Sequence, residues 1–191
     1  MRFNGVRSLI ALTLVAAASG CASAKGNAED AIAAADSTLQ TVAADAQAYV
    51  PDLYTAAGAK VAAARTDFDA GNYADALVQA QEAATEVGGL GAAITARKDE
   101  LTAAWTAMSD SLPGMVQAIQ TRVDELSKMR RLPTGVTKEG LDGAKVTLQE
   151  MTAMWTQATE AYGNGNLADA ASLGTAVKTK AAEVMAALGM K

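Results

Sequence analysis

The chain has 191 residues, of which 50% are hydrophobic and only 4% aromatic, and its formal net charge is −5. It contains no histidine and one cysteine, which excludes Ser-His-Asp and Cys-His catalytic sites, histidine metal sites and any disulfide within one chain. An acidic chain does not favour nucleic acid or anionic lipid headgroups as partners. The length suffices for one sizeable core, which packing alone must stabilise.

The N-terminus has the pattern of a secretory signal. Arg2 and Arg7 precede a short apolar run over residues 8–18, and small residues follow it. About eleven apolar residues are too few to cross a bilayer, which takes about 20. Ordinary signal cleavage after Ala24, at the end of an Ala-Ser-Ala sequence, would release a soluble periplasmic protein without cysteine.

The position of the only cysteine favours a different interpretation, a lipoprotein signal. The sequence Ala18-Ser19-Gly20-Cys21 resembles the lipobox of bacterial lipoproteins, although Ala18 stands where the family usually has leucine. The resemblance implies that residues 1–20 are removed as a signal peptide. It also implies a diacylglyceryl group on the Cys21 thiol, an acyl chain such as palmitate on the new amine, and export to the periplasmic face of the outer membrane. Two or three acyl chains would make attachment effectively permanent, because each buried methylene contributes about 0.8 kcal/mol.

Cleavage before Cys21 would change the charge of the chain. It would remove Arg2 and Arg7 and no acidic residue, leaving 14 basic and 21 acidic side chains and a net charge of −7. Lipid, not charge, would then hold the protein to the membrane. Residues 21–26 are expected to be the lipidated N-terminus and a short linker, with a reach of roughly 20 Å at about 3.5 Å per residue.

Residues 27–190 are expected to be all-α, forming an elongated antiparallel helical bundle of six or seven helices. Prolines number three, and no run alternates apolar and polar residues as a half-buried strand would. Apolar residues recur instead at spacings of three and four, which is typical of packed bundle helices. In the first predicted helix these residues are Ala28, Ile32, Ala35, Leu39, Val42, Ala46 and Tyr49.

Proline and glycine predict the helix ends in the first half. Pro51, Gly71 and the Gly88-Gly89 pair are expected to separate successive helices, because proline restricts the residue before it and glycine accepts a left-handed cap. The last of these breaks suggests two sub-bundles, residues 27–88 and 90–190.

The second half is expected to begin with a helix over about residues 90–110. Pro113 is expected to kink this helix or to start a new one after a tight turn. A loop over residues 131–136 then precedes a long helix that Thr137 caps.

The chain contains an internal repeat. Residues 58–61 (Gly-Ala-Lys-Val) recur at 143–146, with an offset of 85, and the Gly-Asn motif of residues 71–76 recurs at 165–170, with an offset of 94. The difference predicts nine extra residues between the motifs in the second copy. Each copy is expected to be a helical hairpin in which glycine ends one helix and asparagine caps the next.

The hairpin turn carries a family-level resemblance. The pattern Phe68-x-x-Gly71-Asn72-Tyr73-x-x-Ala76 resembles the turn of tetratricopeptide-type hairpins. It is also similar to alanine-rich hairpin lipoproteins of unknown function in bacterial envelopes. The resemblance covers about 20 residues per copy and lacks the repeat period of about 34 residues.

No catalytic motif stands out. Neither GxGxxG nor a P-loop occurs, and adjacent acids such as Asp99-Glu100 are expected on solvated helix faces. The basic cluster of Lys128, Arg130 and Arg131 suits a helix C-terminus and needs no partner. We therefore expect a protein that is not an enzyme.

Two tryptophans and two methionines are the candidate binding residues. Trp105, Met108, Met151 and Trp155 are interpreted either as the largest members of a filled core or as the lining of an apolar pocket. The thioethers of Met151 and Met154 have helical spacing, but without a denser cluster no metal or other cofactor is expected beyond covalent lipid on Cys21.

Three functions remain open, in decreasing order of support. The first is a non-catalytic structural or protein-interaction lipoprotein that docks an unidentified envelope protein. The second is a carrier or sensor of an apolar small molecule or lipid in the bundle core. The third is an envelope hydrolase that uses carboxylates.

Overall fold

The computed structural model describes the backbone of residues 11–190 and the side chains of residues 23–190. The first ten residues of the predicted signal peptide and the side chain of Cys21 lie outside these described parts. None of the helices in the described part is long and apolar enough to span a membrane.

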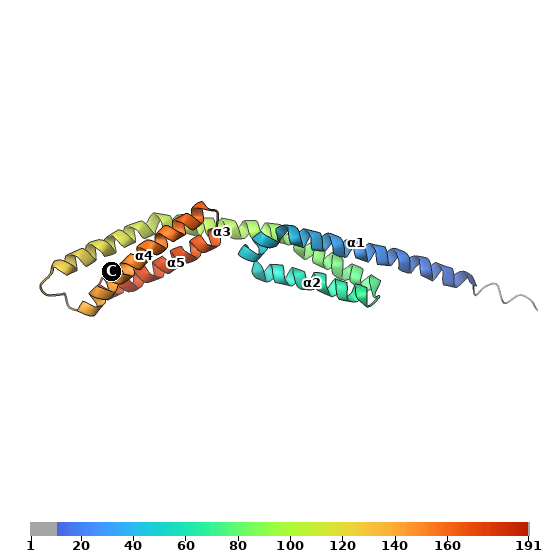
Figure 1. Cartoon of the computed structure of the whole chain (residues 1–191), viewed down its shortest axis with the longest axis horizontal. Helices are drawn as coiled ribbons and strands as arrows, with labels where there is room; N and C mark the ends of the chain where they lie inside the picture. The colour runs from blue at the N-terminus through green and yellow to red at the C-terminus, as the bar shows by residue number, and fades with distance from the viewer. Residues whose placement is uncertain (1–10, 191) are drawn as a thin grey trace, which may run out of the picture. The chain divides into compact units, whose positions relative to one another are not determined.

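Residues 11–190 contain helices and no strand, which confirms the all-α class (Figure 1). These residues form five helices rather than six or seven: α1 (Ala11–Tyr49), α2 (Pro51–Asp69), α3 (Tyr73–Lys128), α4 (Lys138–Gly163) and α5 (Leu167–Ala187). Thr137 caps α4 as predicted, since its side chain accepts a hydrogen bond from the Gly140 amide.

The helix count differs because α3 continues for 56 residues through both predicted breaks. Glycine in a helix costs about 1 kcal/mol relative to alanine, and proline about 3 kcal/mol. At Gly88-Gly89 the neighbouring Val87 and Leu90 are both buried, and their packing offsets the glycine cost. Pro113 follows the fully buried Leu112 and likewise does not break the helix.

The start of α1 also differs from the expectation. Residues 22–26 are helical and continuous with the rest of α1, where the sequence predicted a short linker. Alanine has the highest helix propensity, and Gly26 is the only weak helix former in this stretch.

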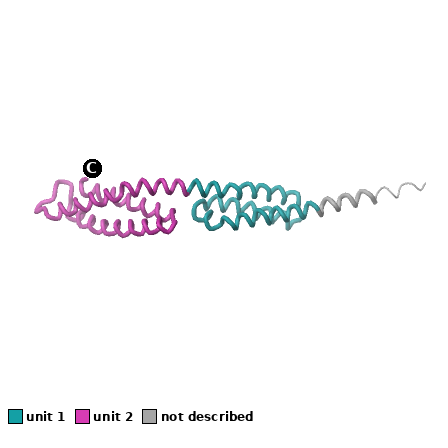
Figure 2. Tube along the Cα trace, turned by 90° about the horizontal axis from the view of Figure 1, so that it is seen from above, with its two compact units in different colours: residues 1–97 teal, residues 98–191 magenta. Residues whose placement is uncertain are grey.

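The chain divides into two compact units, residues 1–97 (unit 1) and residues 98–191 (unit 2) (Figure 2). Unit 1 contains α1, α2 and the first part of α3, and unit 2 contains the rest of α3 with α4 and α5. The boundary lies inside α3, between Arg97 and Lys98, whereas the sequence suggested a division at Gly88-Gly89.

Unit 1 has an alanine-rich core. Its three helical segments meet in two clusters of buried side chains, which pack closely because most are small. The larger cluster contains Ala35, Leu39, Ala46, Ala57, Val61, Ala83, Val87, Leu90 and Ile94. The smaller cluster contains Ala28, Ile32, Ala64, Ala76 and Ala80.

Unit 2 buries larger side chains. The second part of α3 contributes Leu101, Trp105, Met108, Leu112, Ile119, Val123 and Leu126. From α4 come Leu141, Ala144, Leu148, Met151 and Ala158, and α5 contributes mainly alanine, glycine and valine.

The repeat of the Gly-Asn turn is confirmed in the backbone. Gly71 and Gly165 both have left-handed φ angles, 82° and 80°. In each turn the glycine amide bonds the carbonyl three residues back at 3.0 Å, and the asparagine amide bonds the carbonyl five residues back at 2.9 Å. These two bonds form the Schellman motif, which satisfies the last carbonyls of the helix.

The offset of 94 extends over the buried face of the following helix. Six buried positions of α3 match five buried positions of α5 and its C-cap residue: Ala76, Ala80, Ala83, Val87, Leu90 and Ile94 against Ala170, Gly174, Val177, Ala181, Val184 and Leu188.

The prediction that the two Gly-Ala-Lys-Val segments are structurally equivalent is wrong. Val61 is 3% exposed whereas Val146 is 57% exposed, so the two copies lie on different helix faces. The nine additional residues between the motifs in the second copy are therefore not an insertion between equivalent positions. At the offset of 94, the inward positions Ala57, Val61 and Ala64 match Met151, Trp155 and Ala158. The helix α4 is simply longer, at 26 residues against 19 in α2.

Candidate functional site

The aromatic side chains of unit 2 form a stack. The Trp105 ring of α3 lies 5.1 Å from that of Trp155 and 4.7 Å from that of Tyr162, with an interplanar angle of 11° in both pairs. The two α4 rings are seven residues apart, a helix rise of about 10.5 Å. The sum of the two ring spacings matches this rise, so the Trp105 indole fits between them.

Next to this stack, α5 approaches α3 through a glycine. A Cβ atom added at Gly174 would lie 2.9 Å from Met108 Sδ and 3.9 Å from the Trp155 ring. The Thr175 hydroxyl lies 4.0 Å from the same sulfur. Gly174 is therefore the position at which α5 makes room for the methionine and the aromatic stack.

The four candidate pocket residues lie in the interior of unit 2. Trp105 and Met108 are 7% and 8% exposed, Met151 is fully buried, and Trp155 is half-buried. Trp105 stacks on Trp155, and Met108 and Trp155 meet at Gly174. Tyr162 and Gly174 join this group in the structure, although neither was predicted as a site residue. Two signals identify Tyr162: it follows Trp155 by seven residues, and it matches Phe68 in the repeat.

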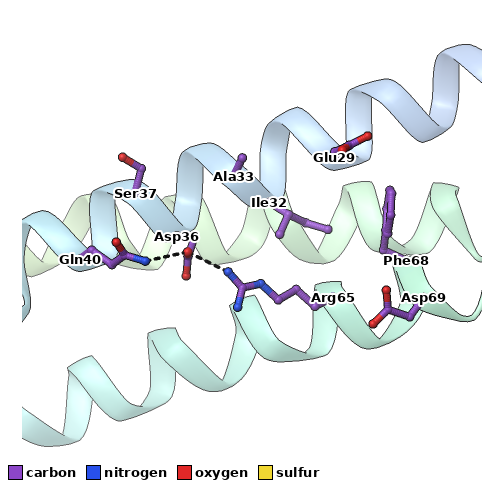
Figure 3. Close-up of a pocket in the computed structure, with 9 residues that line it drawn as sticks. All are labelled: Glu29, Ile32, Ala33, Asp36, Ser37, Gln40, Arg65, Phe68 and Asp69. Atoms are coloured by element: carbon purple, nitrogen blue, oxygen red, sulfur yellow. Dashed lines mark hydrogen bonds and ion pairs between the residues drawn. The ribbon is translucent and has the colours of Figure 1, made fainter.

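A surface groove lies between α1 and α2 in unit 1, with a volume of ≈ 400 Å³ (Figure 3). Asp36 organises one side of the groove: its carboxylate lies 2.7 Å from the Arg65 guanidinium and accepts a hydrogen bond of 2.8 Å from the Gln40 amide. Ile32 and Phe68 supply the apolar lining. The groove was not predicted, because it depends on how two helices pack.

A second aromatic cluster lies where α2 turns into α3. The rings of Phe68 and Tyr73 meet edge to face, with their centroids 5.2 Å apart. Lys25 of α1 places its ammonium nitrogen 6.0 Å from both ring centroids, within the range of a cation–π contact.

Each hairpin carries a surface ion pair between its two helices. In unit 1 the Lys60 ammonium lies 2.6 Å from Glu86, and in unit 2 the Lys180 ammonium lies 2.8 Å from Glu150. The hydrogen bond to Glu86 is the main cause that raises the pKa of Lys60 above 10.5, and the hydrogen bond to Glu150 raises the pKa of Lys180 in the same way.

Over residues 23–190, no charged or polar residue is buried and no three acidic or cysteine side chains gather as metal ligands. The interior of the described part is thus apolar packing, and its polar groups lie at the surface. Comparison of the chain with protein-family models, curated proteins and solved structures finds no match.

Proposed function

We propose that this chain is a lipid-anchored lipoprotein of the bacterial envelope with a non-catalytic role as a structural or protein-docking module. The sequence around Cys21 carries the proposal of an anchor, since its order of basic residues, apolar run, small residues and cysteine is typical of a lipoprotein signal. After processing, the protein would be held at the periplasmic face of the outer membrane.

The packing of the two units supports a docking role for the body. In this proposal each unit is an antiparallel three-helix bundle whose core is filled by its own side chains. The Trp105 stack is closed by Trp155 and Tyr162, and Met108 packs on Gly174. Helical hairpins with filled cores present their outer faces to partners, and an envelope protein is the partner that this location favours.

A carrier of an apolar molecule is the second candidate function. The half-buried Trp155 and Tyr162 are the feature that favours it, since aromatic rings at the rim of a core can contact a ligand. Titration of the full protein with an apolar fluorescent probe distinguishes the two functions. A saturable change in tryptophan fluorescence would favour the carrier, and no saturable change would favour the docking module.

The anchor is tested by the intact mass of protein extracted from membranes, for the wild type beside Cys21→Ser. We expect a wild-type mass equal to residues 21–191 plus acyl groups, and loss of the acyl mass in the variant. A mass equal to residues 25–191 without lipid in both proteins would contradict the anchor and leave a diffusible periplasmic protein.

A further inference from the structure

The first turns of α1 are fixed to one end of unit 1. Lys25 lies against Phe68 and Tyr73, which flank the α2–α3 turn. One turn later, the fully buried Ala28 and the buried Ile32 pack in the same cluster as Ala64, Ala76 and Ala80. Two independent contacts therefore hold residues 25–32 of α1 beside the α2–α3 turn. One is the cation–π contact of Lys25, and the other is the apolar packing of Ala28 and Ile32.

The chain between this contact and the proposed anchor is short. Lys25 follows Cys21 by four positions, so their backbones lie at most about 14 Å apart when extended. The separation falls to about 6 Å along the helix that the backbone forms here. The conformation of these residues therefore changes the distance by only about 8 Å and never carries Lys25 far from the anchored cysteine.

The opposite end of the same hairpin lies much farther away. Leu53 and Ala70 are 17 residues apart along α2, which corresponds to about 26 Å of helix rise. This distance exceeds the whole extended reach between Lys25 and Cys21, so the two ends of the hairpin are not equivalent with respect to the anchor.

We propose that the end of unit 1 formed by the α2–α3 turn (residues 67–75, with Lys25 beside them) is the surface that lies against the lipid bilayer. The proposal rests on the lipid anchor proposed above and specifies which surface of the body meets the membrane.

The charges of this end define how it meets lipid. Asp67, Asp69 and Asp75 surround the turn, and Lys25 is engaged with two aromatic rings. A surface of this charge is not attracted by anionic headgroups. The short chain to the anchor, and not electrostatic attraction, would bring it to the bilayer, so the contact should be insensitive to salt.

The test uses the full chain, produced with its own signal, extracted from membranes and reconstituted into vesicles that contain a headgroup-nitroxide lipid. Ala70→Cys and Leu53→Cys each introduce one exposed thiol at one end of α2, and a maleimide fluorophore is attached. A thioether at Cys21 does not react with maleimide, so the introduced thiol alone is labelled. The wild type, treated in the same way, is the control.

We expect quenching of the A70C label to be several-fold greater than quenching of the L53C label, and to persist at high salt. Equal quenching, or stronger quenching of L53C, in protein that floats with the vesicles would overturn the orientation while leaving the anchor intact. Labelling of the wild-type protein, or its failure to float with vesicles, would overturn the anchor and the orientation together.

Discussion

The two units use the same hairpin backbone and fill it with side chains of different size. Unit 1 places Val61 on the inward face of α2, where unit 2 has Trp155 in α4. On the facing helix, Ala80 of unit 1 corresponds to Gly174 of unit 2. The glycine leaves room for Met108 and lies beside the larger Trp155 ring. The two units therefore share turn geometry and the spacing of their buried positions, while the size of the side chains at those positions differs.

The surface ion pairs of the two units also share a position but differ in the residues that occupy it. Glu86 and Lys180 occupy equivalent positions at the offset of 94, and each pairs with the preceding helix, one with Lys60 and the other with Glu150. The polarity of the pair is reversed between the units, which is tolerated because an exposed pair depends on complementarity and not on which helix carries the cation.

Removal of the large indole in unit 2 should have the largest effect. Trp105→Ala leaves a cavity between Trp155 and Tyr162, and we expect it to lower the free energy of unfolding of unit 2 by about 3–5 kcal/mol. Urea unfolding followed by Trp155 fluorescence measures the loss, because both tryptophans of the chain lie in unit 2. Val146→Ala, at a 57% exposed site of α4, is the control and should change stability by less than about 0.5 kcal/mol. A similar small loss for Trp105→Ala would contradict the stack.

The two turns should respond equally to the same substitution. Gly71→Ala and Gly165→Ala each force a side chain into a left-handed conformation, which costs about 1–2 kcal/mol. Neither position has an atom within 4 Å of the added Cβ, so the cost comes from the backbone alone.

The measurement for the turns is urea unfolding by circular dichroism for both variants and by tryptophan fluorescence for Gly165→Ala. Gly143→Ala is a matched control, because Gly143 lies inside α4 with open space around it and should gain up to about 1 kcal/mol from helix propensity. Unequal losses at the two turns would mean that the units are not equivalent there.

Ala80 and Gly174 occupy equivalent positions, and replacing either residue by the other should lower the free energy of unfolding. Gly174→Ala places a methyl group 2.9 Å from Met108 Sδ. Overpacking of about 1–3 kcal/mol then outweighs the propensity gain of about 1 kcal/mol. Ala80→Gly in unit 1 loses a buried methyl group and helix propensity, again about 1 kcal/mol. Unfolding by fluorescence and circular dichroism checks both variants. In a Met108→Ala background, which lacks the contacting sulfur, adding Gly174→Ala should no longer lower stability. Stabilisation by Gly174→Ala alone would show that Met108 moves aside freely.

The ion pairs should have the smallest effect, with a defined pH dependence. The pKa of Lys60 is raised in the folded state, so its stabilising contribution is fully present below pH 10.5 and is lost as the pH rises through the folded-state pKa above that value. Lys60→Gln should slightly lower the urea midpoint at neutral pH and remove that alkaline change. The double exchange Lys60→Glu with Glu86→Lys should restore the midpoint, as the reversed pair in unit 2 suggests. Lys178→Gln, at an exposed site of α5, is the matched control, and an equal effect there would contradict a specific pair.

The sequence predicted those features that depend on local chemistry. The spacing from Ala28 to Tyr49 identified the inward face of α1, and Gly71 and Gly165 identified the two left-handed turns. Thr137 was identified as a cap from its hydroxyl alone. These features follow from helix period, backbone sterics and nearest-neighbour hydrogen bonds, which a sequence expresses within a few residues.

Tertiary structure decided the rest. Gly88-Gly89 and Pro113 resemble helix breaks locally, yet packing of Val87, Leu90 and Leu112 offsets their cost and keeps α3 continuous. The offset of 94, and not the offset of 85, relates the two hairpins, because Val61 is buried whereas Val146 is exposed. The contact of Lys25 with the α2–α3 turn joins residues more than forty positions apart. Such outcomes depend on which faces meet across the core, and the free energy of that packing is a property of the assembled helices and not of any one segment.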